Sequence, residues 1–169
     1  IEISKAIGAK VIATASNEEK LKVARKYGAD YCINYTNSEF KEKVKEITNK
    51  KGADIIYDPV GGEVFEQSLR CIAWDGRLLV IGFASGKIAK APTNLPLLKN
   101  CSIVGVFWGA WRERSPLGHN QNMEIILKWW KEKKIKPLVS KTFSLQNTKD
   151  ALYALMNREI IGKAVIKIK

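Results

Sequence analysis

Short apolar runs alternate with amphipathic segments along the first two thirds of the chain. The apolar runs predict strands, at residues 10–15, 31–34, 53–57, 77–81 and 102–107. The segments between them predict helices, at residues 1–7, 16–27, 36–49 and 63–72. Strands that are apolar along their whole length and alternate with helices are typical of a parallel sheet covered on both faces. The pattern therefore predicts an α/β fold with a doubly wound parallel sheet.

The pattern changes after residue 109. The next stretch, residues 110–122, reads as a polar loop with a proline, and residues 123–133 carry apolar side chains at helical spacing. A strand, a helix and a last strand are then predicted, at residues 141–144, 148–158 and 164–168. This order breaks the simple alternation and indicates a tail that returns to another part of a larger protein.

Charge and cysteine content narrow the class of protein. The chain has 29 Lys and Arg against 17 Asp and Glu, a net charge of +12. The positive electrostatic potential of such a chain favours anionic partners, nucleic acid among them, although a solvated basic surface explains the same charge. The three cysteines, Cys32, Cys71 and Cys101, lack the spacing of a disulfide framework or zinc site, and reduced thiols suit an intracellular compartment. No apolar run reaches the roughly 20 residues that a membrane span needs.

Glycines gather where three of the predicted strands end. The segments are YDPVGG at residues 57–62, IGFASG at residues 81–86 and VFWG at residues 106–109. In an open α/β sheet, ligands bind outside the carboxyl ends of the strands. Glycine at such a place lets a ligand approach the backbone closely. Together the three turns predict a ligand-binding edge of the sheet.

The first predicted strand ends without a carboxylate. Many nucleotide-binding folds hold a ribose 2′-hydroxyl with an acidic residue at this junction, but here Ser16 follows the strand and Lys20 comes one turn later. Ser16 can donate a hydrogen bond to a phosphate oxygen and Lys20 can neutralise its charge, near a helix N-terminus that favours an anion. The structural alternative is that Ser16 and Glu19 form an S-x-x-E capping box and that Lys20 faces solvent.

The order of four segments resembles one protein family. They read GAKVIATASNEEK, GADYCINY, GADIIYDPVGGEVFEQSLRCIAWDGRLLVIGFASG and REIIGKAVIKI. In this order they resemble the quinone oxidoreductase branch of the medium-chain dehydrogenase/reductases, which are zinc-independent relatives of the alcohol dehydrogenases. The resemblance implies a Rossmann-type sheet whose first strand and glycine-rich turn are missing here, as in a C-terminal fragment. It also implies a partial dinucleotide-binding domain at residues 1–133 and a return segment of the GroES-like catalytic domain at residues 134–169.

The resemblance further implies NADPH as the cofactor. Tyr35, in the INY motif, is then expected to face the 2′-phosphate beside Ser16 and Lys20, the alternative being a partly buried aromatic residue. The other residues expected near the cofactor are Pro59, Val60, Phe83, Ala84, Ser85, Phe107, Trp108, Gly109, Gly162 and Lys163. Core packing is the alternative for the aromatic side chains. Trp108 departs from the family pattern, which leaves the shape of the acceptor pocket open.

No acid–base residue or metal site can be assigned from the sequence. His119, the only histidine, is predicted in the polar loop as a solvated side chain, and Asp58 is predicted to cap the turn that Pro59 begins. The chain has no Ser-His-Asp set and no metal-ligand spacing. These residues fit zinc-free hydride transfer, in which the cofactor carries the chemistry and the protein orients it.

The resemblance implies that the parent protein reduces a quinone or an α,β-unsaturated carbonyl, a small electrophilic acceptor. Two other classes stay open: a non-catalytic dinucleotide- or RNA-binding protein on a dehydrogenase scaffold, and a methyltransferase-like domain, which usually has an acidic residue where this chain has Ser16. A homodimer through the edge strand at residues 102–107 and a cytoplasmic or mitochondrial location are also expected. Without the glycine turn, this chain alone is expected to bind the cofactor weakly.

Overall fold

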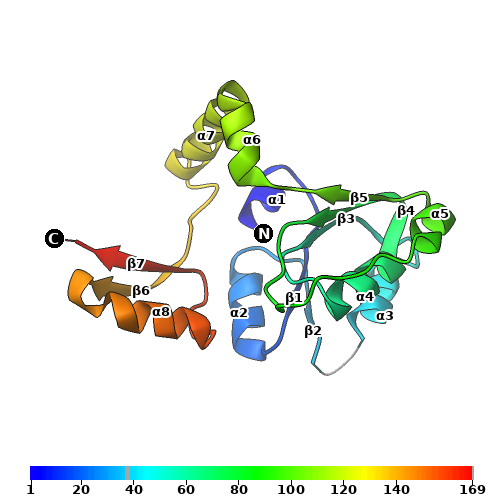
Figure 1. The fold of residues 1–169 in the computed structure, drawn as a ribbon, viewed down its shortest axis with the longest axis horizontal. Helices are drawn as coiled ribbons and strands as arrows, with labels where there is room; N and C mark the ends of the chain where they lie inside the picture. Colours follow the sequence, from blue (N-terminus) through cyan, green and yellow to red (C-terminus); the bar gives the residue numbers. More distant parts are fainter. Residues whose placement is uncertain (37–38, 169) are drawn as a thin grey trace.

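The computed structural model describes residues 1–36 and 39–168. Its first part contains, in chain order, α1 (Glu2–Ala6), β1 (Ile12–Ala15), α2 (Glu18–Lys26), β2 (Tyr31–Asn34), α3 (Phe40–Ile47), β3 (Ala53–Asp58), α4 (Glu63–Cys71), β4 (Ile72–Val80), α5 (Asn94–Lys99) and β5 (Ser102–Gly105). Two helices then stand apart from the strands, α6 (Trp108–Arg114) and α7 (Pro116–Lys131) (Figure 1). The chain closes with β6 (Val139–Ser144), the 3-10 helix η1 (Leu145–Asn147), α8 (Thr148–Met156) and β7 (Lys163–Lys167).

The strand pairs of the described chain are all parallel, which confirms the predicted α/β class. β1 pairs with β2, and β3, β4 and β5 form a second sheet in that order. Within the described residues, β1 and β3 each have one edge without a strand partner. The sheet is thus interrupted between β1 and β3, at the position where the resemblance implies the missing first strand.

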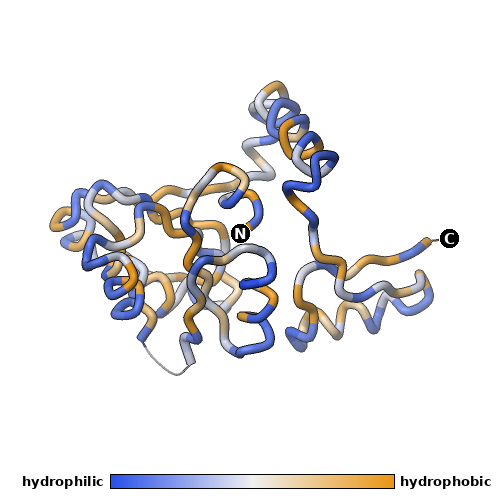
Figure 2. Tube along the Cα trace, turned by 180° about the vertical axis from the view of Figure 1, so that it is seen from behind, coloured by the Kyte–Doolittle hydropathy of each residue, from blue (hydrophilic) through white to orange (hydrophobic). Residues whose placement is uncertain are grey.

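A shared core holds the two sheets together across the interruption. One buried cluster joins β2, α3 and α4, and its members are Ile33, Phe40, Val44 and Cys71. Ile12 of β1 and Ile56 of β3 pack against this cluster from the two sheets. A second cluster lies between α4 and β4, formed by Phe65, Leu69, Ile72 and Leu78. In Figure 2 the strands run as apolar segments through the interior, while the outer turns of the helices are hydrophilic.

Polar contacts anchor α1 to the rest of the chain. The Lys5 ammonium donates to both carboxylate oxygens of Asp30 at 2.9 Å, and the backbone N–H of Val11 donates to the same carboxylate at 2.7 Å. These hydrogen bonds, with that from Lys5 as the largest cause, lower the pKa of Asp30. Glu2 accepts a hydrogen bond from the backbone N–H of Lys136. The first helix is therefore tied both to β2 and to the segment after α7.

The polar loop predicted at residues 110–122 is wrong, because α6 and α7 occupy this stretch. Proline at the first helical position costs no hydrogen bond, since the first N–H groups of a helix have no intrahelical partner. Pro116 takes that position in α7, and the N–H of His119 donates to the Ser115 carbonyl at 2.9 Å. Glycine disfavours a helix, so Gly118 and the polar residues around it favoured the prediction of a loop.

The C-terminal elements form a unit of their own. β6 and β7 pair with each other, and α8 packs on both of them (Figure 1). Ala151 and Ala154 are the buried residues of α8. The division of the chain at residue 133 into a dinucleotide-binding part and a catalytic return segment stays a prediction. Among the described residues, no helix has the length and apolar character required to cross a bilayer.

Burial gives Cys71 an unusual titration. Its side chain is 1% exposed, and burial raises the pKa of the thiol from 9.0 to about 11. Because the folded state holds this proton more tightly than the unfolded chain, the stabilisation is complete below the unfolded pKa. It is lost as the pH rises from there through the folded pKa, at about 1.4 kcal/mol per pH unit.

Urea unfolding at about pH 8 and about pH 10 measures this effect. We expect the free energy of unfolding to fall between the two pH values by a larger amount in the unsubstituted protein than in Cys71→Ala. Other groups that titrate in this range contribute equally to both proteins, so the variant isolates the thiol. An equal fall in the two proteins would contradict the burial effect.

Candidate functional site

The carboxyl ends of β1 and β2 bring Ser16, Lys20 and Tyr35 to one edge of the structure. The two strands run in parallel with Ala15 opposite Asn34, and the N–H of Tyr35 donates to the Ala15 carbonyl at 3.2 Å. Ser16 directly follows β1, and Lys20 lies in the first turn of α2. Residues that are far apart in the sequence therefore lie at neighbouring strand ends, as the predicted 2′-phosphate site requires.

Asn17, and not Ser16, caps α2. Its extended backbone, with φ −151° and ψ 162°, lets its side-chain oxygen accept a hydrogen bond from the Lys20 N–H at 2.9 Å. The predicted capping box of Ser16 and Glu19 is therefore wrong, because Ser16 lies one residue too early. Within residues 1–36 and 39–168, the Ser16 hydroxyl makes no hydrogen bond and the Lys20 ammonium makes no ion pair. With respect to the described residues, both groups are therefore open to a ligand.

Two carboxylates, Glu18 and Glu19, lie in the first turn of α2 beside this junction. The Glu18 carboxylate is 2.5 Å from the Arg25 guanidinium, which offsets its charge, whereas Glu19 is exposed to solvent. This contact with Glu18 raises the pKa of Arg25, with the side-chain hydrogen bond as the largest cause. Tyr35 is half-buried and its side chain packs against the Phe40 cluster. The core-packing alternative therefore holds for part of the Tyr35 side chain.

Asp58 organises the turn after β3. It is 2% exposed, and its Oδ1 accepts hydrogen bonds from the N–H groups of Val60 at 2.8 Å and Gly61 at 3.0 Å. The predicted capping role of Asp58 is confirmed. Gly61 has φ +72°, and a Cβ there would lie 2.9 Å from the Lys87 carbonyl oxygen, so only glycine fits.

The turns after β3 and β4 are joined by hydrogen bonds. The N–H of Ala84 donates to the Pro59 carbonyl at 3.0 Å, and both the N–H and the hydroxyl of Ser85 donate to the Val60 carbonyl, at 3.0 and 2.8 Å. The structure therefore brings together the two turns that the glycine pattern marked. The Ser85 hydroxyl holds the turn itself. Phe83 remains 46% exposed beside it.

The end of β5 presents aromatic side chains. The N–H of Val106 donates to the Val80 carbonyl at 3.0 Å, so this end lies beside the end of β4. Phe107 is 79% exposed and Trp108, the first residue of α6, is 54% exposed. Core packing, the alternative for these aromatics, does not describe side chains that are this accessible. Gly109 follows in the first turn of α6.

Gly162 and Lys163 lie in the C-terminal unit. Gly162 has φ +98°, and a Cβ there would come within 2.6 Å of the Leu138 carbonyl oxygen. The N–H of Lys163 donates to the same carbonyl at 2.8 Å. These contacts start β7 beside β6 and do not join Gly162 or Lys163 to the other candidate residues. Their approach to a cofactor stays a prediction.

The surroundings of His119 differ from those that the sequence predicted. It lies on α7 and not in a solvated loop, it is half-buried, and its ring centroid is 5.5 Å from that of Trp108. Its Nδ1 is buried, and no group in the described part of the chain bonds to it. Proline directly after Ser115 was the available signal, because this pair is typical of a helix start.

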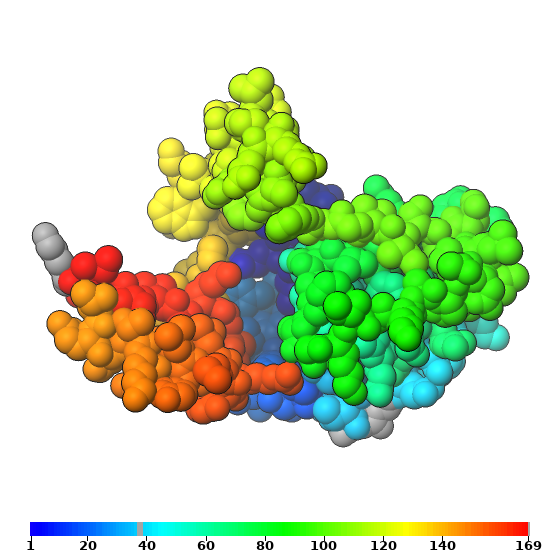
Figure 3. Space-filling model, in the orientation of Figure 1, coloured from blue at the N-terminus to red at the C-terminus, as the bar shows by residue number. Residues whose placement is uncertain are grey.

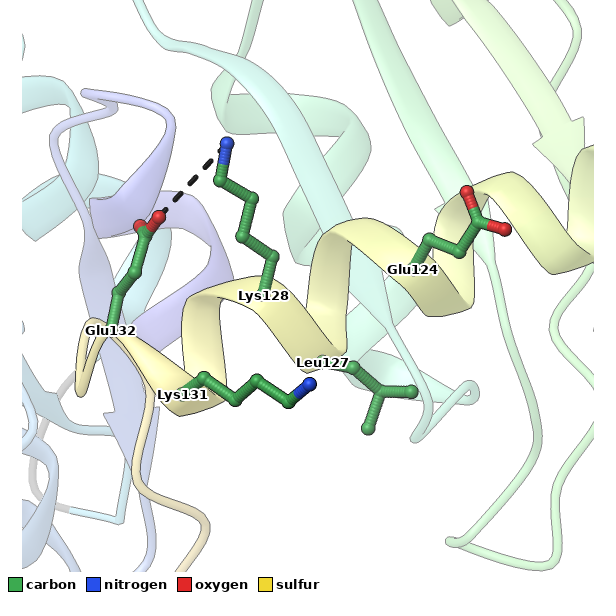
Figure 4. A pocket seen from close by; sticks show the side chains of 5 residues that line it. All are labelled: Glu124, Leu127, Lys128, Lys131 and Glu132. Carbon is green, nitrogen blue, oxygen red and sulfur yellow. Dashed lines mark ion pairs between the residues drawn. The ribbon is translucent and has the colours of Figure 1, made fainter.

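A hollow of the surface lies away from these strand ends. It lies on α7 and is lined by Glu124, Leu127, Lys128, Lys131 and Glu132 (Figure 4). Lys128 and Glu132 pair across it at 4.0 Å. Its lining comes from one helix and its charges are mixed, so it offers no cradle for a dinucleotide. Figure 3 shows a second opening, which α6 and α7, the C-terminal unit and the sheet body surround.

The residues that the structure describes do not fit a metal site. No three His, Cys, Asp or Glu side chains among them gather in one place. Cys71 is buried, whereas Cys32 and Cys101 are only partly buried and lie elsewhere. Burial also raises the pKa of Cys32. These cysteines therefore do not form the ligand set of a structural zinc ion.

The sequence matches the zinc-binding dehydrogenase family over residues 1–120. A quinone oxidoreductase-like protein 2 homolog of Nematostella vectensis is 43% identical over 163 residues, which cover 96% of this chain and 44% of that protein. An acryloyl-coenzyme A reductase of Sulfurisphaera tokodaii is 31% identical over 168 residues, covering 99% and 46%. The crystal structure of an NAD-dependent alcohol dehydrogenase aligns with a TM-score of 0.86 and 30% identity over 99% of this chain and 46% of that chain.

Fold, sequence and strand-end turns agree on one family. The chain spans a little under half the length of these curated relatives. Its parallel strands and covering helices are those of the dinucleotide-binding fold. The chain therefore belongs to the zinc-binding dehydrogenase family, in the quinone oxidoreductase branch of the medium-chain dehydrogenase/reductases.

Proposed function

We propose that this chain supplies the NADPH-binding part of a reductase for quinones or α,β-unsaturated carbonyls. The names of two relatives, a quinone oxidoreductase-like protein and an acryloyl-coenzyme A reductase, support this class of acceptor. One observation carries the choice of cofactor: β1 is followed by Ser16 and Lys20, whose side chains have no hydrogen-bond or ion-pair partner among the described residues, where a carboxylate would select NADH.

Ser16, Lys20 and Tyr35 hold the 2′-phosphate in this proposal. The Ser16 hydroxyl donates to a phosphate oxygen, and the Lys20 ammonium neutralises the charge. One relative by structure is named an NAD-dependent alcohol dehydrogenase. Membership of the family alone does not choose between the two cofactors, so the proposed preference for NADPH depends on these residues of the present chain.

A nicotinamide cofactor, when held at this edge of the sheet, would supply the hydride that reduces the electrophilic carbon of the acceptor. The hydrogen bonds from Ala84 and Ser85 to the carbonyls of Pro59 and Val60 make the two turns a rigid support for the cofactor. The exposed Trp108 gives the acceptor an apolar surface beside the end of β5. In the proposed reaction these residues bind and orient, and no zinc-dependent step is assigned to them.

Cofactor oxidation by the full-length protein tests the proposal. We expect the nicotinamide absorbance to fall in the presence of 9,10-phenanthrenequinone or cyclohex-2-en-1-one, and to fall faster with NADPH than with NADH. Lack of acceptor-dependent oxidation with either cofactor would contradict the reductase activity. Faster oxidation of NADH would contradict the cofactor assignment alone.

The alternative, a non-catalytic dinucleotide- or RNA-binding protein, has less support. Two of the relatives found carry the names of oxidoreductases. The lysines around the end of α7 are partly neutralised, since Lys128 and Lys134 both pair with Glu132. RNA binding of useful affinity that falls steeply with salt would favour the alternative.

The proposal includes a homodimer formed through β5. Ile103 and Val104 are 38% and 36% exposed, and the outer edge of β5 has no strand partner within the described chain. The N–H of Val106 faces β4, so in the alternating pattern of a strand the N–H of Val104 faces β4 and those of Ile103 and Gly105 face outward. Such an edge offers unpaired backbone groups to a second copy.

Ile103→Pro removes one outward N–H and spares the bonds to β4. We expect the full-length protein to sediment as a dimer and this variant as a monomer, because proline cannot donate to the partner strand. Ile103→Val keeps the N–H and serves as the matched control, which should remain dimeric. Dimers in all three proteins would show that another surface forms the interface.

A further inference from the structure

The structure places the single histidine of the chain against an exposed tryptophan. The rings of His119 and Trp108 meet edge to face, with centroids 5.5 Å apart and an interplanar angle of 67°. Nδ1 of His119 is buried and lacks a hydrogen-bond partner among the described residues. A buried polar atom without a partner is unfavourable. Burying this nitrogen against Trp108 therefore costs free energy, which the ring contact has to offset.

A cation–π contact also holds the Trp108 indole, and a glycine allows the two helices to pack closely. The Arg112 guanidinium lies over the indole, 5.8 Å from the ring centroid, as a cation–π contact. Gly118 lets α7 approach α6 closely, since a Cβ there would lie 2.8 Å from Ser115 Oγ and 3.2 Å from Trp111 Cζ2. The indole is thus contacted by Arg112 of α6 and by His119 of α7, while 54% of Trp108 remains exposed.

We propose that His119 is a positioning residue that holds the Trp108 indole as a stacking surface for an aromatic, quinone-type acceptor. The proposal rests on the proposed function, because Trp108 lies three residues after the end of β5, where the acceptor end of the cofactor is expected. A fixed indole stacks well on a flat aromatic ring, whereas a small non-aromatic enone gains little from it. His119 therefore selects aromatic acceptors over small enones without touching either of them.

Steady-state kinetics of the full-length protein with two acceptors test this role. Replacing His119 by alanine is expected to raise KM for 9,10-phenanthrenequinone about three- to tenfold. KM for NADPH and kcat/KM for cyclohex-2-en-1-one should stay near their original values. His119→Phe keeps a ring against Trp108 and is expected to restore the low KM for the quinone. Asn120→Ala, at the exposed neighbouring position of α7, is the control and should change neither acceptor.

Quenching of tryptophan fluorescence by 9,10-phenanthrenequinone gives a second readout without turnover. We expect its midpoint to move to higher quinone concentration in His119→Ala and to return in His119→Phe. Equal losses of kcat/KM for both acceptors, or an unchanged ratio between them, would overturn the role of His119 while the reductase activity stands. If the unsubstituted protein reduces neither acceptor, the proposed function fails and this proposal fails with it.

Discussion

Full-length protein with Ser16 and Lys20 both replaced by alanine is expected to bind NADPH about 10- to 100-fold more weakly than the unsubstituted protein. NADH binding should be nearly unchanged, because NADH lacks the 2′-phosphate that these groups contact. The substitution of Ser16 costs the free protein little, since Asn17 caps α2 and the Ser16 hydroxyl makes no hydrogen bond in the described part of the chain. Calorimetric titration with each cofactor measures the change.

Lys22→Ala is the matched control for this double variant. Lys22 is exposed on the same helix, so its loss removes the same charge without removing a group from the proposed phosphate site. Both cofactors should bind this control as they bind the unsubstituted protein. Equal weakening of NADPH and NADH in the double variant would mean that Ser16 and Lys20 act on the whole cofactor and not on its phosphate.

Replacing Asp58 by alanine is expected to lower the free energy of unfolding by about 2–4 kcal/mol. The carboxylate is 2% exposed, and its loss leaves the N–H groups of Val60 and Gly61 without an acceptor. The turn that is joined to Ala84 and Ser85 loses its support, so cofactor affinity should fall as well. Urea unfolding and cofactor titration of the same protein measure the two effects.

Two conservative variants make the Asp58 result interpretable. Asp58→Asn keeps a side-chain oxygen that can accept both N–H groups, so its loss of stability should be clearly smaller than that of Asp58→Ala. Asp54→Asn removes an exposed carboxylate from the same strand and should change little. Stability of Asp58→Ala equal to that of the unsubstituted protein would refute the role of this carboxylate in the turn.

The strands of the sheet body were predictable because each is a short apolar run between turn signals. The main deviation is β4, which begins at Ile72 although the sequence predicted residues 77–81. Asp75 and Gly76 read as a turn, and Asp75 does adopt φ +59°. The strand continues past them, because glycine at position 76 allows an approach in which a Cβ would lie 2.6 Å from Ile72 Cγ1. Sequence pattern does not distinguish such a bulge from a turn.

The candidate site was predictable where the backbone itself defines it. Asp58 and the glycines after it bring the turns together, and the strand order brings Ser16, Lys20 and Tyr35 to one edge. The choice between Ser16 and Asn17 as the helix cap was not predictable. Both residue types cap helices well, and the outcome depends on the backbone angles of a single residue.

The contact of His119 with Trp108 could not be read from the sequence. It depends on how α6 and α7 pack, and the sequence had predicted a loop for much of that stretch. Side chains 11 positions apart meet only because both segments are helical and turn back on each other. Local propensity gives no information on such a tertiary contact.

The selection of a 2′-phosphate by the end of β1 is the central claim, and one calorimetric experiment isolates it. Adenosine 2′,5′-bisphosphate and AMP share the adenosine and the 5′-phosphate, and they differ only in the 2′-phosphate. We expect the full-length protein to bind the bisphosphate more tightly, and we expect the difference to vanish in the Ser16 and Lys20 double variant. Equal affinity for the two nucleotides, or tighter binding of AMP, would contradict the assignment of NADPH to this site.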